Sequence, residues 1–133
     1  MKGSIKFKSE IQNLNKAEIV LKKVSEIAEI SDENYGYILL ALSEAINNAI
    51  VHGNKMNEEK EVKVTYKASK DSIEFIVEDQ GQGFDPDSVP DPTSPENIEK
   101  ATGRGIFIIK NLADKVEFDK GGRVIKMNFN LKK

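Results

Sequence analysis

The chain has 133 residues, of which 38% are hydrophobic and 32% are charged. A chain of this size buries roughly two thirds of its unfolded surface, so one folded domain over residues 1–133 is expected and a second catalytic domain is excluded. There is no cysteine and only one histidine, which excludes a disulfide framework, a thiolate metal site and a histidine cluster.

The formal net charge is −2, and lysine and glutamate are mixed along the chain. This pattern lacks the basic footprint of nucleic-acid binding, so no direct nucleic-acid partner is expected. The segment MKGSIKFKSE lacks the apolar stretch of a signal peptide, and nowhere do about 18 or more apolar residues run together. We therefore expect a cytoplasmic protein without a membrane partner.

The first half of the chain predicts a strand, two helices and a hairpin. Residues 4–8 alternate enough to indicate a short edge strand, and apolar residues then recur at helical spacing: Ala17, Val20, Leu21, Val24, Ile27 and Ala28. A second helix should begin after Ser31, which offers an N-cap, and end at about Gly53. Alternating residues over 62–68 and 73–77 predict the two strands of the hairpin.

The second half begins with a long irregular stretch. From Gly81 to Thr102 the periodicity stops, and all four prolines fall there. A loop of this length in a compact domain is usually a functional lid or disordered. Helical spacing resumes at Ile106, and a hairpin with a Gly121–Gly122 turn closes the chain. This order predicts a two-layer α+β fold, with helices on one face of a mixed, mostly antiparallel sheet.

The second expected helix carries the first candidate site. Glu44, Asn48 and His52 share one face, because each step of four residues drifts by only about 40°. The apolar residues point the opposite way, toward the core: Ile38, Leu42, Ala45, Ile46, Ala49 and Ile50. A solvated helix surface is one interpretation of the polar face. The adjacent Asn47 and Asn48 weigh against it, since Asn in a helix centre usually has a hydrogen-bonding reason.

The second candidate site is the segment VEDQGQGF, which follows the strand over 73–77. Counting in twos along that strand puts Asp79 on the core side, where a carboxylate needs a donor such as the exocyclic amine of adenine. Gly81 and Gly83 let the backbone bend and a flat ligand approach closely. A plain glycine-rich turn is the alternative. A calcium loop fits poorly, because the glycines stand where oxygen ligands belong.

The third candidate site is the segment TGRG at residues 102–105, which opens the last helix. The free N–H groups and the positive dipole end of a helix N-terminus favour phosphate, and glycine lets the anion approach. A simple flexible hinge is the alternative. The segment is not a Walker A loop, which needs Lys followed by Ser or Thr, and it lacks the third glycine of a Rossmann fingerprint.

In this order, SEAINNAIVHGN, VEDQGQGFDP and TGRGIFII resemble the N, G1 and G2 boxes of the GHKL (Bergerat-fold) ATP-binding superfamily. The chain resembles in particular the bacterial anti-sigma factor serine/threonine kinases of the sporulation and general-stress type, over nearly its whole length. The resemblance implies a histidine kinase-like ATPase fold with an ATP lid at about 84–102. A histidine kinase would also need a dimerisation helix pair, for which there is no room.

The resemblance also implies a role for each matching position. Glu44 would be the general base near the attacking hydroxyl, Asn48 would coordinate the Mg²⁺ that bridges the ATP phosphates, and Asp79 would bind the adenine amine. Gly81 and Gly83 would shape the adenine pocket. The contacts to the phosphates would come from Lys100, Gly103, Arg104 and Gly105. His52 would also contact the phosphate, although a structural role at the helix end is an equal alternative.

The implied function is an ATP-dependent protein serine/threonine kinase and anti-sigma regulatory factor that phosphorylates a STAS-type anti-anti-sigma protein in a partner-switching pathway. A sigma factor and a homodimer partner are implied as well. The alternative is a non-catalytic ATP-binding anti-sigma or adaptor protein that sequesters its partner, and the intact Glu44 favours the kinase. Two positions depart from the family pattern: the spacing from Lys100 to Gly103 is one residue longer than expected, and Arg123 stands where Thr is common.

Overall fold

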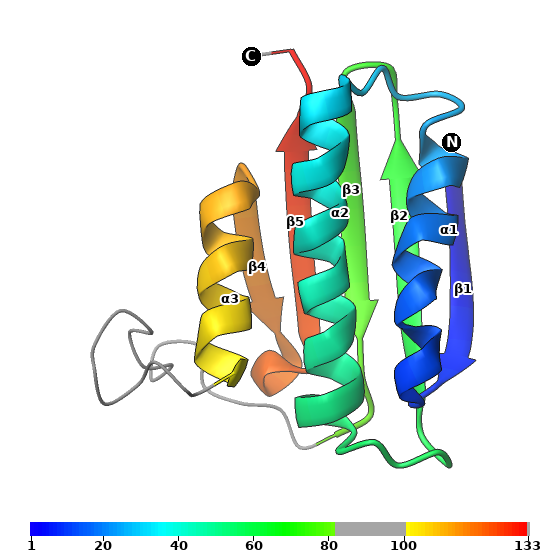
Figure 1. Cartoon of the computed structure of the whole chain (residues 1–133), viewed down its shortest axis with the longest axis vertical. Helices are drawn as coiled ribbons and strands as arrows, with labels where there is room; N and C mark the ends of the chain where they lie inside the picture. The colour runs from blue at the N-terminus through cyan, green and yellow to red at the C-terminus, as the bar shows by residue number, and fades with distance from the viewer. Residues whose placement is uncertain (82–100, 133) are drawn as a thin grey trace.

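The chain folds into a sheet covered on one face by helices (Figure 1). A computed structural model describes residues 1–81 and 101–132. In these residues the sheet has five strands in the order β1-β2-β3-β5-β4. Their bounds are Lys2–Lys8 for β1, Glu61–Ala68 for β2, Ser72–Glu78 for β3, Lys115–Asp119 for β4 and Val124–Asn130 for β5. The expected edge strand and both expected hairpins are confirmed.

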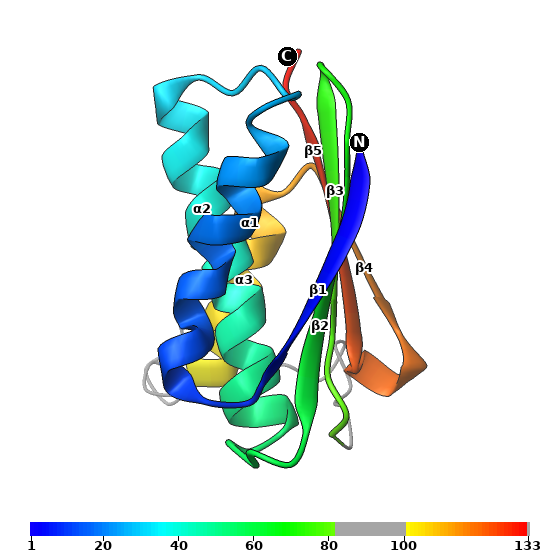
Figure 2. The same ribbon diagram turned by 90° about the vertical axis from the view of Figure 1, so that its right-hand side faces the viewer.

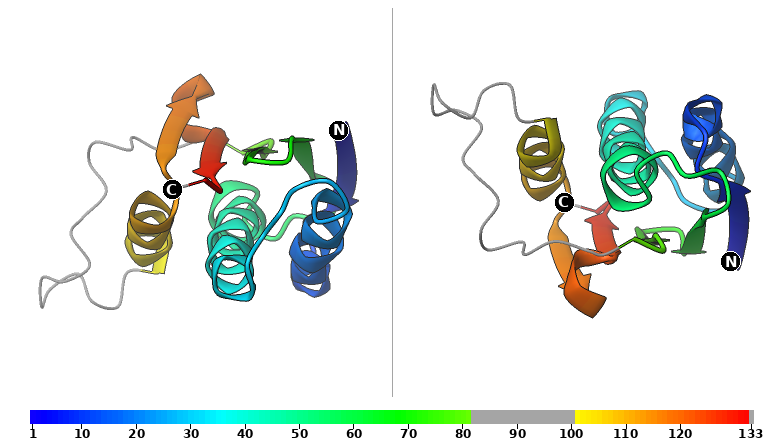
Figure 3. Two further views of the ribbon diagram at one scale, coloured as in Figure 1. Left: turned by 90° about the horizontal axis from the view of Figure 1, so that it is seen from above. Right: turned by 90° about the horizontal axis from the view of Figure 1, so that it is seen from below.

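The helical layer contains α1 (Lys16–Val24), α2 (Asp32–Asn47) and α3 (Ala101–Leu112). All three lie on the same face of the sheet, and no described helix covers the other face (Figures 2 and 3). Shorter turns are the 3₁₀ segments η1 (Ile11–Asn15) and η4 (Lys120–Gly122) and the π-helical turn η2 (Asn48–Gly53), which continues α2. The predicted two-layer α+β architecture is confirmed.

Every pair of neighbouring strands in the described sheet is antiparallel, so the sheet is not mixed. The pairs β2–β3 and β4–β5 are hairpins, and for β1 and β2 the reason is the number of helices between the strands. After β1 the chain runs along α1 in one direction and back along α2 in the other, so it returns to the end of the sheet that it left (Figure 1). β2 must then run opposite to β1, whereas a single crossover helix would have returned it parallel.

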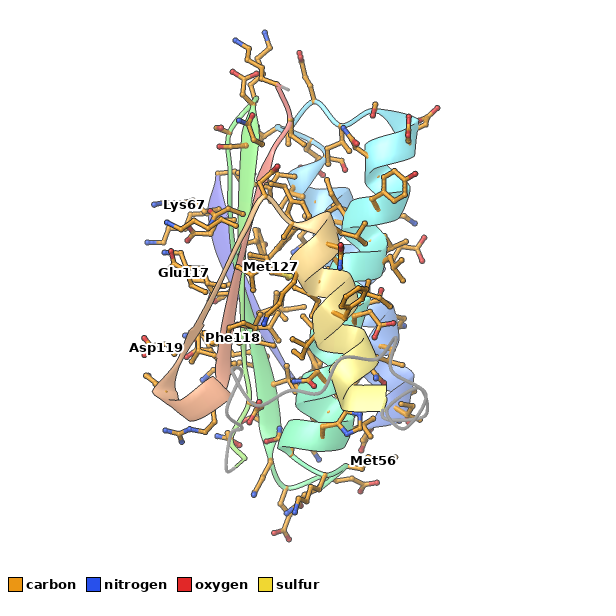
Figure 4. All side chains as sticks on the ribbon, turned by 90° about the vertical axis from the view of Figure 1, so that its left-hand side faces the viewer. Met56, Lys67, Glu117, Phe118, Asp119 and Met127 are labelled. Carbon is orange, nitrogen blue, oxygen red and sulfur yellow. The ribbon has the colours of Figure 1, made fainter. Side chains whose placement is uncertain are left out.

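Side chains from both layers fill the space between them. The sheet contributes its alternate residues, such as Val62, Phe75 and Met127, all fully buried. Figure 4 shows Met127 between the layers, while Lys67 and Glu117 lie on the open face of the sheet. The two strand faces therefore differ as a period of two predicts.

The helix ends have local causes. Ser31 caps α2 as expected, because its hydroxyl accepts a hydrogen bond of 3.2 Å from the Asn34 N–H. α1 ends at Val24, before the predicted limit, and the Ser25 hydroxyl there donates to the Leu21 carbonyl at 2.7 Å. This leaves Ile27 exposed beyond the helix. Within residues 1–81 and 101–132, no helix is both long enough and apolar enough to cross a membrane.

Candidate nucleotide site

The end of α2 carries the residues of the first predicted site, and its helical geometry changes there. α2 passes into the π-helical turn η2 at Asn48, and the Asn54 N–H closes the turn on the Ala49 carbonyl at 2.8 Å. Turns of this wider kind inside a helix are rare and occur frequently at functional sites. The polar face of the predicted helix thus ends in an irregular turn that includes both Asn48 and His52.

Asn48 is the most unusual polar residue of this turn. Its exposed fraction is 3%, and its side-chain oxygen Oδ1 is buried without a hydrogen-bond partner in the described part of the chain. Leaving a buried acceptor unpaired costs about 1–3 kcal/mol. The interpretation of this position as part of a solvated helix face is therefore wrong, and the oxygen lacks a donor within the described residues.

Glu44 lies one turn before Asn48 and faces the start of α3. A Cβ atom built on Gly105 would lie 3.0 Å from Glu44 Oε2, tighter than most packed contacts. Gly105 is buried and helical, so its lack of a side chain leaves room for the carboxylate of Glu44. The first and third predicted segments are thus neighbours in space.

Asp79 and two glycines interlock at the other side of the site. A Cβ atom on Gly53 would overlap the Asp79 carboxylate, and one on Gly81 would overlap the Gly53 carbonyl. The end of η2 and the segment after β3 can approach this closely only because both positions are glycine. Gly53 ends the helix as predicted, but sequence reasoning missed its contact with Asp79.

The carboxylate of Asp79 is held by the backbone around it. Its Oδ1 accepts a hydrogen bond of 2.8 Å from the Gly81 N–H, and the Asp79 N–H donates to the Arg123 carbonyl at 3.0 Å. Within the described residues, no hydrogen bond reaches Oδ2. A plain glycine-rich turn would account for the hydrogen bond from the Gly81 N–H to Oδ1. The other oxygen, Oδ2, can accept a hydrogen bond from an N–H of a ligand.

Burial shifts the pKa values of two site residues. It raises the pKa of Asp79, although the hydrogen bond from Gly81 and the charges of Arg123 and Lys60 act in the opposite direction. Burial lowers the pKa of His52, which favours the neutral imidazole. Groups whose pKa values are shifted by burial occur at functional sites as well as in structural settings, so the shifts agree with a site here without establishing one.

The raised pKa of Asp79 predicts a pH-dependent effect of Asp79→Asn. Because the folded chain favours the protonated carboxyl, this group contributes stability below its ordinary pKa of 3.8 and loses it as the pH rises through the higher folded-state pKa. Asparagine cannot ionise, so the variant without nucleotide should melt at a higher temperature than wild type at pH 7. The gain should shrink toward pH 4. Thermal unfolding across this range tests it, and a gain that does not depend on pH would contradict it.

Asn54 is a further site residue that sequence reasoning missed. Only 1% exposed, it joins three segments of the chain. Its amide nitrogen donates to Ser9 Oγ at 2.6 Å and to the Glu61 carbonyl at 3.0 Å, while its oxygen accepts from the Gln80 N–H at 2.7 Å. These bonds place the residue after Asp79 against the ends of β1 and β2. No local pattern marks this role, because the partners are distant in sequence.

The remaining predicted site residues lie at or beyond the edge of the described structure. Gly103 and Arg104 belong to the first turn of α3, and the side chain of Arg104 is not among those described. Gly83 lies outside the described residues. So do residues 84–100 of the expected lid, which include Lys100. The last two lid positions, Ala101 and Thr102, are helical.

The described residues fit a magnesium nucleotide. Mg²⁺ prefers oxygen ligands, takes only one or two from the protein and keeps the others as water and phosphate. The unpaired oxygen of Asn48 is a ligand of that kind. No group of three or more His, Cys, Asp or Glu residues that could hold a metal occurs in the described part of the chain, so a metal here would depend on additional oxygens from the ligand.

Comparison with known proteins agrees with this geometry. Residues 7–129 match the family described as the histidine kinase-like ATPase domain. The chain is 32% identical over 109 residues to serine-protein kinase RsbW of Oceanobacillus iheyensis, covering 77% of this chain and 69% of that protein. It is 29% identical over 117 residues to RsbW of Listeria monocytogenes, covering 82% and 74%. These matches confirm the resemblance read from the three motifs. The chain belongs to the histidine kinase-like ATPase domain family.

Proposed function

We propose that this chain is an ATP-dependent protein serine/threonine kinase and anti-sigma regulatory factor. Its acceptor would be a Ser or Thr of a STAS-type anti-anti-sigma protein, in a pathway where a sigma factor is the other partner. Membership of an ATPase domain family supports the use of ATP. The relatives named serine-protein kinase support protein phosphorylation as the reaction.

Glu44 acts as the general base in this proposal. Its carboxylate accepts the proton of the acceptor hydroxyl as the oxygen of that hydroxyl forms its bond to the γ-phosphorus of ATP. The bond from that phosphorus to the bridging oxygen breaks, and ADP leaves with that oxygen. Gly105 supports this role, because a side chain there would crowd Oε2. When bound, Mg²⁺ with ATP supplies the transferable phosphoryl group and neutralises charge on the phosphates.

Asn48 holds Mg²⁺ through Oδ1, and Asp79 accepts a hydrogen bond from the adenine amine. These two assignments rest on the oxygens without described partners. Further nucleotide contacts are assigned to Gly81, Gly83, Lys100, Gly103, Arg104, Gly105 and His52. The proposal also includes an ATP lid over about 84–102 and a homodimer formed through the side of the sheet near β1.

The observation that carries the proposal is the pairing of Asn48 with Glu44. A buried acceptor without a partner costs stability, and the glycine at position 105 leaves space beside the carboxylate of Glu44. Both features are useful if a metal nucleotide and a hydroxyl meet at this end of α2. Phosphoryl transfer needs little else from the protein than such positioning and charge neutralisation.

The test is incubation of wild type and Glu44→Ala with Mg-ATP and a purified STAS-domain protein from the same genome. Intact mass should show one added phosphate with wild type, and the rate should fall by roughly 10²–10⁴-fold in the variant. ATP binding, measured by calorimetry, should persist in both. If ATP binds but no acceptor gains mass, the non-catalytic anti-sigma or adaptor function is the better account. Failure to bind ATP would exclude both functions.

A further inference from the structure

Three large apolar side chains are exposed on α2 and α3. Their exposed fractions are 49% for Tyr37, 44% for Leu40 and 42% for Phe107. We call these three residues the α2–α3 apolar surface. Tyr37 and Leu40 are one helical turn apart, and α2 and α3 pack side by side (Figure 1). Single exposed apolar residues need no explanation, whereas several on two adjacent helices are candidates for an interaction site.

This surface extends to the proposed general base. Leu40 precedes Glu44 by four residues, so the two share a face of α2 and lie about 6 Å apart along its axis. Tyr37 lies about 10 Å from Glu44 by the same rise per residue. The contact of Glu44 with Gly105 places the base at the junction of α2 and α3.

A hollow marks the other end of the same junction. It has a volume of about 230 Å³ and is lined by Tyr37 and Ile38 of α2, by Asn111 and Leu112 of α3, and by residues around the end of β5. Ile38 and Phe129 give it an apolar floor, while Asn111 and Asn130 give it a polar rim. The Asn111 amide also donates to the Phe107 carbonyl at 2.8 Å, which connects the rim to the apolar surface. A hollow of this size suits a protein side chain better than a drug-sized ligand.

The proposed reaction determines what covers this surface. A protein that brings its hydroxyl to Glu44 must also cover residues one turn away on the same helix face. The charge of α2 indicates the chemistry of the partner beside that helix, because α2 contains Asp32, Glu33 and Glu44 and no Lys or Arg, whereas the basic residues of the junction are on α3. Basic side chains on the partner would complement these carboxylates and speed association.

We propose that the α2–α3 apolar surface docks the phosphoryl-acceptor protein. The acceptor places apolar side chains on Leu40 and Phe107, and one of them enters the hollow beside Tyr37. These side chains lie about 6–10 Å from its Ser or Thr, with basic residues next to them. The inference rests on the proposed kinase function and adds the surface that selects its protein substrate.

The experiment compares wild type with Leu40→Lys and Phe107→Lys, each of which replaces an exposed side chain and should fold. The matched control is Ile27→Lys, because Ile27 is 48% exposed but lies past the end of α1. The probe is the purified STAS-domain protein, with binding measured by calorimetry in the presence of Mg²⁺ and a non-hydrolysable ATP analogue. Both test variants should raise the Kd and KM for the probe by about 10-fold or more, as for central interface residues. The Kd for ATP, the thermal stability and the control should stay within about twofold of wild type.

Each other result overturns a distinct part of the argument. An unchanged Kd and KM for the probe in both test variants overturns the docking surface while leaving the kinase function intact. An equal loss in Ile27→Lys also overturns it, because added charge would then act anywhere on the protein. If wild type binds the probe without phosphorylating it, the kinase function fails, and the docking surface stands when the two test variants weaken binding. Absence of any binding by wild type overturns both.

Discussion

Asn48→Leu should stabilise the protein and remove its affinity for magnesium nucleotide. Leucine is similar in size but has no polar atom, so it abolishes the cost of the unpaired buried Oδ1. The free energy of unfolding without nucleotide should rise by about 1 kcal/mol. Loss of an outer-shell partner weakens a metal site by roughly 10–100-fold, and Asn48 is proposed as a direct ligand. The Kd for Mg-ATP should therefore rise by at least that factor. Denaturant unfolding and calorimetry measure the two effects.

The adjacent asparagine is the control for this prediction. Asn47→Leu changes the same residue type in the same helix turn, but Asn47 is only partly buried. It should leave the Kd for Mg-ATP within about twofold of wild type, since surface substitutions rarely have larger effects. Asn48→Asp keeps an oxygen ligand and should retain more magnesium affinity than Asn48→Leu. A loss of stability in Asn48→Leu would mean that Asn48 is a structural residue and would contradict its assignment as a ligand.

Asn54→Ala should weaken both folding and nucleotide recognition. The change removes three hydrogen bonds and leaves the Gln80 N–H and the Ser9 hydroxyl without their partner. The free energy of unfolding should fall by about 3 kcal/mol. Because Gln80 follows Asp79 directly, the carboxylate should also lose its position against Gly53. The Kd for ATP should then rise even at temperatures where the variant is fully folded.

Base discrimination separates positioning of Asp79 from simple destabilisation. Purine riboside 5′-triphosphate lacks the amine that Asp79 would bind, so wild type should prefer ATP over it by about 10-fold or more. In Asn54→Ala this preference should decrease, because the acceptor is displaced. The control is Asn57→Ala, an exposed asparagine of the same loop that accepts one bond of 2.9 Å from the Glu59 N–H. A preference unchanged in folded Asn54→Ala would limit Asn54 to a structural role.

The elements of the fold were predictable because each leaves a periodic trace in the sequence. Alternation over β2 and β3 marked the central hairpin, and apolar residues at helical spacing marked the buried side of α2. The cap at Ser31 was also readable, since it depends only on a residue three positions away. The early end of α1 was not, because the apolar spacing continues past the last helical residue.

The sequence by itself predicted that Glu44 and Asn48 share a helix face, because residues four apart lie on one side of an α-helix. It did not predict the π-helical turn that contains His52, where the regular α-helical spacing ends. The burial of Asn48 and the interlock of Gly53 with Asp79 and Gly81 were decided only by the tertiary structure. So were the bonds of Asn54, whose partners Ser9 and Gln80 are 45 and 26 residues away. The antiparallel sheet likewise depends on how two helices return the chain. Spacing records the geometry of a few neighbouring residues, whereas burial and long-range hydrogen bonds exist only after distant segments have packed together.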